Sequence, residues 1–290
     1  MIIVLMGPTG VGKSALAIPL AKAIGGEIVN ADAFQAYEYL SIATAAPKEE
    51  DMRIVPHHLY HYIPLSEEYN ISRYQKDARN VIQNILSRHK TPILVGGSGL
   101  YIRSALYDYD LSVDTSNIDL STFEQLDDET LHHKLEELDK EEAKKIHPHN
   151  RRRVLRDIAI CLALGRSKTS FLKEQSHEPI YPTRFFHLIL GRDALYPLVE
   201  KRVEAMFSMG LLEETIPLIE KYGRDAPAFK AIGVKELFPY LDGNISLEEA
   251  KQSIKDNTRH YIRRQETFFL HQFPHEEVTS FDEIMLKLGK

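Results

Sequence analysis

Eight residues near the start of the chain limit its fold more than any other feature. Residues 7–14 read Gly-Pro-Thr-Gly-Val-Gly-Lys-Ser and fit the pattern G-x-x-x-x-G-K-[ST] in full. A short apolar run over 2–6 precedes them, and a helical pattern over 13–23 follows. In such a strand–loop–helix unit, backbone N–H groups and the positive end of the helix converge on an anion. The sequence therefore predicts a P-loop for phosphate or pyrophosphate, formed by Gly7, Pro8, Thr9, Gly10, Val11, Gly12, Lys13 and Ser14.

Two of these residues carry specific roles in the pattern. Lys13 is expected to reach the terminal phosphates, and the hydroxyl of Ser14 is expected to coordinate Mg²⁺, the predicted cofactor. By itself the pattern suggests a nucleotide-binding, ATP-binding protein, but it does not specify the phosphate compound.

The strand ends elsewhere in the chain narrow the choice. An ordinary NTPase would carry a later apolar strand that ends in Asp or Glu and binds the metal. Here the strand at 92–95 ends in glycines and Ser98, and Asp32 is the one acid that follows a strand, at 27–30. Strand ends of an open α/β sheet lie where ligands bind. The Asp32 carboxylate is therefore predicted to be a metal ligand or a general base, with a cap of the next turn as the purely structural alternative.

The order of the elements predicts the fold class. Short, mainly apolar strands over 2–6, 27–30 and 92–95 alternate with helices, one of which starts at a predicted capping box of Ser72 and Gln75. This pattern is typical of a parallel sheet covered on both faces. The predicted fold is α/β, a P-loop parallel sheet flanked by helices, with an inserted mostly helical domain.

A change in composition marks the insertion. From Asp108 to about His133 the chain is rich in Asp, Ser and Thr, and helical stretches follow at about 134–146 and 151–164. The strand pattern returns at 185–190, and the last third is helical. The predicted C-terminal helices are about 195–221, about 231–241 and a long helix that starts at a capping box of Ser246 and Glu249. The predicted domains are 1–108 for the first part of the core, 109–183 for the insertion and 184–290 for the second part of the core.

Composition excludes several classes of protein. No stretch approaches the about 20 apolar residues that a membrane span needs, so no membrane partner is expected. The single cysteine, Cys161, excludes an internal disulfide and fits a reducing cytoplasm, where we expect the protein to work. The formal net charge of −6 argues weakly against nucleic acid, because local basic faces decide such binding.

At this level of detail the chain resembles the tRNA dimethylallyltransferases, also called tRNA isopentenyltransferases. The likeness extends over nearly the whole chain, as eight segments in the family's order. They are Gly-Pro-Thr-Gly-Val-Gly-Lys-Ser (7–14), Asn-Ala-Asp-Ala-Phe-Gln-Ala-Tyr (30–37), Ala-Thr-Ala-Ala-Pro (43–47), Pro-His-His-Leu (56–59), Gly-Gly-Ser-Gly-Leu-Tyr (96–101), Ile-His-Pro (146–148), Ala-Ile-Gly-Val-Lys-Glu (231–236) and Thr-Arg-His-Tyr-Ile-Arg-Arg-Gln-Glu-Thr (258–267). Each segment alone is weakly specific, but eight of them in order are strongly specific.

The chain departs from the family pattern at several positions. Those that differ are Ala33 for Ser, Ala43 for Gly, Ala46 for Lys, Asn150 for Asp, Leu198 for Arg, Phe268 for Trp, and Leu270 and His271 for basic residues. Asp32, Gln35, Lys13 and the rest of the P-loop match. The departures therefore bear on substrate affinity and tRNA range more than on the reaction.

The resemblance implies transfer of a dimethylallyl group from dimethylallyl pyrophosphate to the exocyclic amine of an adenosine beside the anticodon. The adenine amine is a poor nucleophile that must lose a proton as it attacks, so Asp32 is the predicted general base. Ser98 is expected to position the same amine, and Arg202 to stabilise the leaving pyrophosphate together with the P-loop. A monomer suffices for this chemistry.

The resemblance also implies contacts with the anticodon stem-loop of tRNA. The adenosine must be flipped out of its stack, and Gln35 is a predicted reader of the flipped base. Basic residues near two helix patterns, 151–156 and 259–264, are expected to contact the RNA backbone. The predicted tRNA-binding residues are Asp32, Ala33, Phe34, Gln35, Ser98, Arg152, Arg153, Arg156, Arg259, Arg263 and Arg264.

Three other interpretations stay open at this stage. The first is a P-loop kinase for a small molecule or nucleotide, with the 109–183 insertion as its lid. The second is an isopentenyltransferase that acts on free adenine nucleotides. The third is a non-enzymatic module that senses nucleotides and binds RNA.

Overall fold

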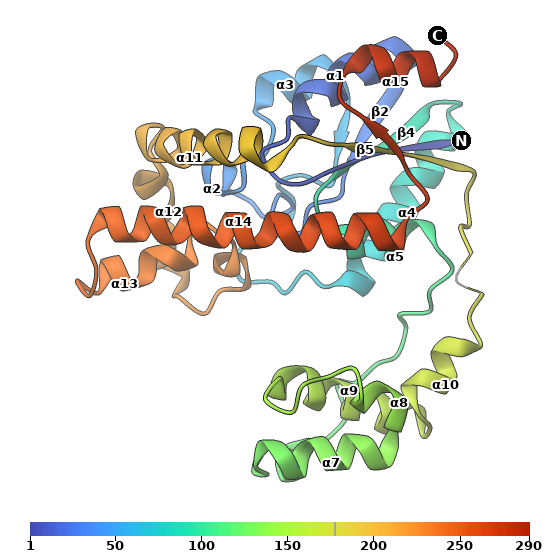
Figure 1. Ribbon diagram of the computed structural model, residues 1–290, viewed down its shortest axis with the longest axis vertical. Coiled ribbons are helices and arrows are strands. Elements are labelled where there is room, and N and C mark those ends of the chain that lie inside the picture. The colour runs from blue at the N-terminus through green and yellow to red at the C-terminus, as the bar shows by residue number, and fades with distance from the viewer. Residues whose placement is uncertain (177) are drawn as a thin grey trace. The chain divides into compact units, whose positions relative to one another are not determined.

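The computed structural model describes residues 1–176 and 178–290. The chain forms two compact units (Figure 1). The first contains Met1–Leu106 and Tyr181–Lys290, and the second contains Tyr107–Ile180. Most of the predicted insertion, 109–183, falls within the second unit. Over the described residues, no helix combines the length and apolar character needed to cross a bilayer.

A six-stranded sheet forms the centre of the first unit. All its strand pairs are parallel, in the order β3-β2-β4-β1-β5-β6, which confirms the predicted fold class. The strands are β1 (Ile2–Met6), β2 (Gly26–Asn30), β3 (His57–His58), β4 (Thr91–Gly96), β5 (Thr183–Leu188) and β6 (Glu276–Val278). The edge strands β3 and β6 were not predicted, because two or three residues carry too little periodicity to stand out.

Helices cover both faces of the sheet, which explains why its central strands β1 and β4 are almost wholly apolar. Helix α1 (Lys13–Ile24) packs its Ala17, Leu20 and Ala21 side chains on one face, together with Ile284 of α15 (Phe281–Lys287). Helices α4 (Ile71–Ser87) and α5 (Gly99–Leu106) pack against the strands from the other side (Figure 1). With both faces covered, every residue of β1 and β2 is buried.

Helix boundaries agree with most predicted caps but not all. Gly25 ends α1 in the left-handed conformation, at φ 65°. Helix α4 begins two residues earlier than predicted: Asn70 is its cap and accepts from the N–H of Arg73, so the predicted capping box of Ser72 and Gln75 is wrong. Asn is as good an N-cap residue as Ser. The helix that starts after Asn70 buries Tyr74.

The C-terminal helices were predicted in kind but not in every boundary. The stretch 195–221 is two helices, α11 (Arg192–Ser208) and α12 (Leu211–Tyr222), because Gly210 turns the chain at φ 99°. The stretch 231–241 holds only short turns of helix. The capping box of Ser246 and Glu249 is confirmed at the start of α14 (Leu247–Gln272).

The remaining helices are short or belong to the second unit. In the first unit they are α2 (Ser41–Thr44), α3 (Glu49–Ile54), η1 (Pro227–Lys230), η2 (Lys235–Leu237) and α13 (Phe238–Leu241). In the second they are α6 (Ser121–Glu124), α7 (Asp128–Leu138), α8 (Lys140–Ala143), α9 (Arg151–Leu164) and α10 (Lys168–Lys173). The second unit has its own apolar core, which includes Leu131 and Leu135 of α7 and Val154 and Ile158 of α9.

The close approach of β4 to β2 gives a test of the fold. A Cβ atom at Gly96 would lie 2.1 Å from the carbonyl oxygen of Ala31, which is backbone and cannot turn away. Gly96→Ala should lower the free energy of unfolding by at least about 2 kcal/mol, as overpacking does in a tight core. Urea denaturation measures the change. Gly191→Ala is the matched control, because an added Cβ there meets nothing within 4 Å; equal losses in both variants would contradict the described contact.

Candidate active site

The carboxyl ends of three neighbouring strands bring the predicted site residues together. Strand β4 lies between β1 and β2, with Met6 beside Gly96 and Asn30 beside Val95. The residues that follow these strands therefore leave the sheet at the same edge. They are the P-loop after β1, Asp32 after β2 and Ser98 after β4.

The P-loop has a backbone that glycine alone accommodates well. Gly10 and Gly12 have φ values of 83° and 100°, in the left-handed region. A Cβ at Gly7 would lie 2.6 Å from the carbonyl oxygen of Leu188 at the end of β5. Gly12 occupies the N-cap of α1, and within the described chain no side chain accepts from the first turn there. The first-turn amides of Lys13 and Ser14, which line the cavity beside the loop, are therefore suited to an anion.

Lys13 lies folded over the loop that precedes it. Its Nζ donates to the carbonyl oxygens of Gly7 at 2.8 Å and Pro8 at 2.9 Å. Burial lowers the pKa of Lys13 to about 8; the charge of Asp32 opposes this shift and that of Arg202 adds to it. A bound polyanion would supply the opposite charge that this ammonium group lacks.

Asp32 is held with its carboxylate toward the same cavity. Its N–H donates to Oδ1 of Asn30 at 2.8 Å, and its Oδ1 accepts from the N–H of Phe34 at 3.0 Å. Burial raises the pKa of Asp32, against the hydrogen bond from Phe34 and the charges of Lys13 and Arg202. A carboxylate with a raised pKa in a cavity is suited to accept a proton.

Ser98 lies close to Asp32 because the turn after β4 packs on the segment after β2. The N–H of Ser98 donates to Ala31 O at 3.1 Å, and its Oγ accepts from the N–H of Ala33 at 3.2 Å. These two contacts hold the hydroxyl beside the Asp32 segment, where it was predicted to act.

Arg202 reaches the site from α11, far away in the sequence. Its guanidinium donates to Oγ1 of Thr9 at 3.4 Å, a long contact, and burial lowers its pKa while the charge of Asp32 opposes the shift. Lys13 and Arg202 thus place two cations beside one carboxylate. This balance favours an anionic ligand.

Two cavities meet at the site and have some lining residues in common. One, of about 320 Å³, is lined by polar groups of the P-loop; the other, of about 210 Å³, extends between α11 and α14. Side chains common to both are Thr9, Asp32, Thr44 and Arg202. The second cavity is apolar where Val199, Val203, Met206, Ala231, Ile232 and Ile254 line it. Together they offer a polar chamber for phosphate joined to an apolar chamber for a hydrocarbon or base.

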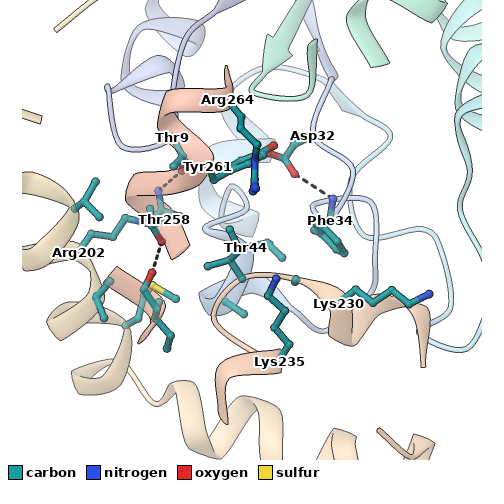
Figure 2. A pocket seen from close by; sticks show the side chains of 17 residues that line it. Thr9, Asp32, Phe34, Thr44, Arg202, Lys230, Lys235, Thr258, Tyr261 and Arg264 are labelled. Carbon is teal, nitrogen blue, oxygen red and sulfur yellow. Dashed lines mark hydrogen bonds between the residues drawn. The ribbon is translucent and has the colours of Figure 1, made fainter. Parts of the chain in front are cut away.

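Figure 2 shows the apolar cavity with side chains that the sequence did not assign to the site. Tyr261 lies beside Asp32, and burial, with the Asp32 charge, raises the pKa of this tyrosine to about 12. Lys230 and Lys235 lie across from it. Tyr261 and Lys235 belong to segments that resemble the family, and Tyr261 lies in the segment 259–264 that was expected to contact RNA. The signal was therefore present, although no role in this cavity was drawn from it.

Gln265 joins the P-loop to the turn after β4. Its Oε1 accepts from the N–H of Thr9 at 2.9 Å, and its Nε2 donates to Gly97 O at 2.8 Å. A Cβ at Gly97 would lie 2.2 Å from that Nε2 atom. This buried amide from α14 thereby fixes the spacing between the two loops that carry the site.

A carboxylate and an amide fix helix α2, which brings Thr44 to the cavities. Glu214 of α12 accepts from the N–H groups of Ser41, Ile42 and Ala43 at 2.9, 2.8 and 2.9 Å. At the other end, Gln35 Nε2 donates to Thr44 O at 3.0 Å and Ala45 O at 3.1 Å. Gln35 lines the polar cavity, and within residues 1–176 and 178–290 its Oε1 accepts no hydrogen bond from another side chain, so this atom is available to a ligand.

The predicted arginines differ in how far the fold already uses them. In the second unit Arg153 pairs with Glu142 at 3.2 Å, whereas Arg152 and Arg156 are exposed and pair with no carboxylate among the described residues. In the first unit Arg259 pairs with Glu200 and Asp256. Arg264 lines the apolar cavity, and Arg263 lies next to it on α14. Contact of these residues with tRNA stays a prediction.

Known proteins are similar to this chain in sequence and in fold. A family model described as IPP transferase matches residues 35–272. The chain is 41% identical to a tRNA dimethylallyltransferase of Anoxybacillus flavithermus, over 94% of this chain and 88% of that protein. It is 39% identical to a tRNA dimethylallyltransferase of Bacillus subtilis, over 97% and 90%.

Two solved structures of tRNA-modifying enzymes are also similar to this chain. A tRNA isopentenylpyrophosphate transferase of Staphylococcus epidermidis has a TM-score of 0.74 at 35% identity, over 99% of this chain and 98% of that one. A eukaryotic dimethylallyltransferase, captured acting on tRNA, has a TM-score of 0.85 at 29% identity, over 98% of this chain and 75% of that one.

The lowered pKa of Lys13 predicts how anion affinity depends on pH. The ammonium is charged below about pH 8 and loses its proton above it, so affinity for inorganic pyrophosphate should fall as pH rises through 8. The dissociation constant should rise by up to about tenfold per pH unit beyond the ligand's own titration. Calorimetry between pH 6.5 and 9.5 measures it. Lys13→Met should bind weakly and retain only the ligand's own dependence; the same slope in both proteins would contradict the prediction.

The three hydrogen bonds to Glu214 predict a local loss of stability. Glu214→Ala should lower the free energy of unfolding by about 2 kcal/mol, because hydrogen bonds to a charged group are lost together. Hydrogen exchange at the amides of Ser41, Ile42 and Ala43 should speed up. Glu213→Ala, an exposed neighbour on the same helix, is the control. Unchanged protection of these amides in Glu214→Ala would refute the assigned contact.

Proposed function

We propose that this chain, which belongs to the IPP transferase family, uses the two joined cavities to transfer a dimethylallyl group from dimethylallyl pyrophosphate to tRNA. The acceptor is the exocyclic amine of an adenosine next to the anticodon. The observation that carries the residue assignment is the meeting of a P-loop and a buried carboxylate, Asp32, at one edge of the sheet.

Asp32 is the proposed general base. As the new C–N bond forms, the adenine amine becomes positively charged and must release a proton. The Asp32 carboxylate takes that proton, and Ser98 positions the amine beside it. The raised pKa of Asp32 makes its carboxylate a stronger base than that of an exposed aspartate.

The polar cavity is the proposed site of the leaving group. The C–O bond of the donor breaks, and pyrophosphate carries away the bonding electrons. Backbone amides of the P-loop, Lys13 and Arg202 surround the place where this negative charge grows. Because the fold already holds these donors in place, they can stabilise the negative charge without reorganising during the reaction. The apolar cavity beside it, between Val199 and Met206 of α11, suits the dimethylallyl group.

The donor set also fits Mg²⁺ held in part by the substrate. Ser14 lines the polar cavity at the first turn of α1, and the described residues hold no cluster of three or more His, Cys, Asp or Glu side chains for a metal. Mg²⁺ keeps several waters and is usually bound by one or two protein groups plus substrate phosphates. We propose that Ser14 supplies one ligand and the pyrophosphate oxygens supply others. When bound, the ion would neutralise part of the leaving group's charge.

The other interpretations are not favoured. Relatives that match over most of their length are tRNA dimethylallyltransferases, and none of those reported above is a kinase. An acceptor limited to free adenine nucleotides would leave the likeness to an enzyme acting on tRNA unexplained. We further propose that the protein acts as a monomer, because the site residues named above come from one chain. We also propose that it works in the cytoplasm, where reducing conditions suit a chain with the single cysteine Cys161.

A single labelling assay tests the proposed function. The protein is incubated with Mg²⁺, labelled dimethylallyl pyrophosphate and either unmodified tRNA or AMP. Label should appear in tRNA alone, at an adenosine next to the anticodon. Label in AMP, or phosphate transfer from ATP in a parallel reaction, would overturn the proposal.

Asp32→Asn separates chemistry from binding in the same assay. The variant should bind inorganic pyrophosphate within a few-fold of the parent protein. Its turnover should fall by about 10²- to 10⁴-fold, the usual contribution of a general base. In the parent protein, the rate should rise with pH through the raised pKa of Asp32, because the ionised form is the base. Near-normal turnover in Asp32→Asn would remove this residue from the role.

A further inference from the structure

A surface groove on α14 begins where the apolar cavity ends. It has a volume of about 400 Å³ and is lined by Arg263, Arg264, Thr267, Phe268, His271 and Gln272. Arg264 lines both the groove and the apolar cavity. The groove therefore adjoins the apolar cavity at Arg264, and a molecule that fills the cavity and extends past this side chain would enter the groove.

Phe268 is held firmly at the wall of this groove. A Cβ at Gly99 would lie 2.3 Å from its ring, so the ring packs directly on the backbone at the start of α5. The ring centroid of Phe273 lies 6.0 Å from that of Phe268, with the two rings tilted by 55°. A half-buried ring supported in this way offers a flat apolar surface. Because the ring is already ordered, a ligand that stacks on it does not have to order a mobile side chain.

The groove is also rich in positive charge that the fold leaves available. Arg263 donates to the hydroxyl of Tyr196 at 3.3 Å, and Arg264 lies over the ring of Tyr261. Within residues 1–176 and 178–290, neither arginine pairs with a carboxylate. Glu266, the nearest acid in sequence, is paired with Arg192 at 2.7 Å. A planar ring beside unpaired guanidinium groups is the combination that binds single-stranded nucleic acid.

We propose that this groove binds a nucleotide directly next to the acceptor adenosine, with its base stacked on Phe268 and its phosphate near Arg263 and Arg264. The inference rests on the proposed function, because it needs an RNA whose adenosine occupies the site. Four residues of helix separate Arg264 from Phe268, which is about 6 Å along α14. When a flipped adenosine occupies the site, the nucleotide on its 5′ or 3′ side can thus reach the groove.

The stacking assignment can be tested by a cycle of protein and RNA changes. The RNA is an anticodon stem-loop with the acceptor adenosine, and in two further versions the base on its 5′ or its 3′ side is removed. Each is bound at equilibrium to the parent protein and to Phe268→Leu, which keeps an apolar side chain but has no ring. Binding is measured without donor, so the cycle does not depend on turnover.

Loss of one stacked base should weaken binding by roughly 5- to 150-fold. Phe268→Leu and removal of one flanking base should each cause a loss of this size, and the combination should cause little more than either alone. Phe268→Trp should bind the intact RNA at least as tightly as the parent protein. Leu270→Ala, an exposed apolar residue outside the groove on the same helix, is the matched control and should change nothing.

Two outcomes would overturn the inference in different ways. If the losses from Phe268→Leu and base removal simply multiply at both flanking positions, Phe268 acts through packing and stacks on no base. The same holds if Phe268→Leu leaves RNA affinity unchanged, as a groove for a peptide would predict. Affinity for inorganic pyrophosphate should stay within twofold in every variant. If the parent protein neither binds nor labels tRNA, the proposed function fails and this inference fails with it.

Discussion

The parallel pairing of β4 between β1 and β2 is the interaction on which the site depends. Its register places Met6 beside Gly96 and Asn30 beside Val95, so three chain segments leave the sheet at one edge. The contact is tight enough that Gly96 has no room for a Cβ atom. A shift of one residue in this register would turn every buried side chain of β4 to the other face of the sheet. The core that holds the strands in register is therefore also what brings Asp32 and Ser98 together.

Polar contacts from distant helices refine what the sheet provides. Gln265 of α14 bridges Thr9 and Gly97, and Glu214 of α12 holds the start of α2 by three amides. In both cases one side chain binds backbone groups of another segment. These contacts therefore hold the loops of the site in place. Arg202 depends on the same arrangement, since its position over Thr9 requires the P-loop to be fixed. The C-terminal helices thus complete a site that the sheet begins.

The sequence could predict the parts of the site that local patterns encode. The strand–loop–helix unit at 2–23, the ends of β1 and β2 and the capping box at Ser246 follow from spacing and composition, and the structure has them as predicted; β4 ends one residue later and β5 two residues earlier than predicted. Gln265 was recognised only as part of a matching segment, because nothing local says that its amide lies against Thr9, 256 residues away. The error at Ser72 has a similar cause: Asn70 and Ser72 are both good caps, and the choice between them depends on which helix face packs on the sheet. Long-range packing decided what periodicity could not.

The charges of the site explain why two cations accompany one carboxylate. Burial raises the pKa of Asp32 and lowers that of Lys13, so in the absence of an anion each charge depends partly on the other. Pyrophosphate would raise both pKa values, because negative charge favours the protonated form of either group. For Lys13 this secures the charge that binds the donor. For Asp32 it increases basicity, and the charges of Lys13 and Arg202 oppose the rise in its pKa. A base is most effective when its pKa lies near the working pH, and the two cations oppose the rise that burial causes in the pKa of Asp32.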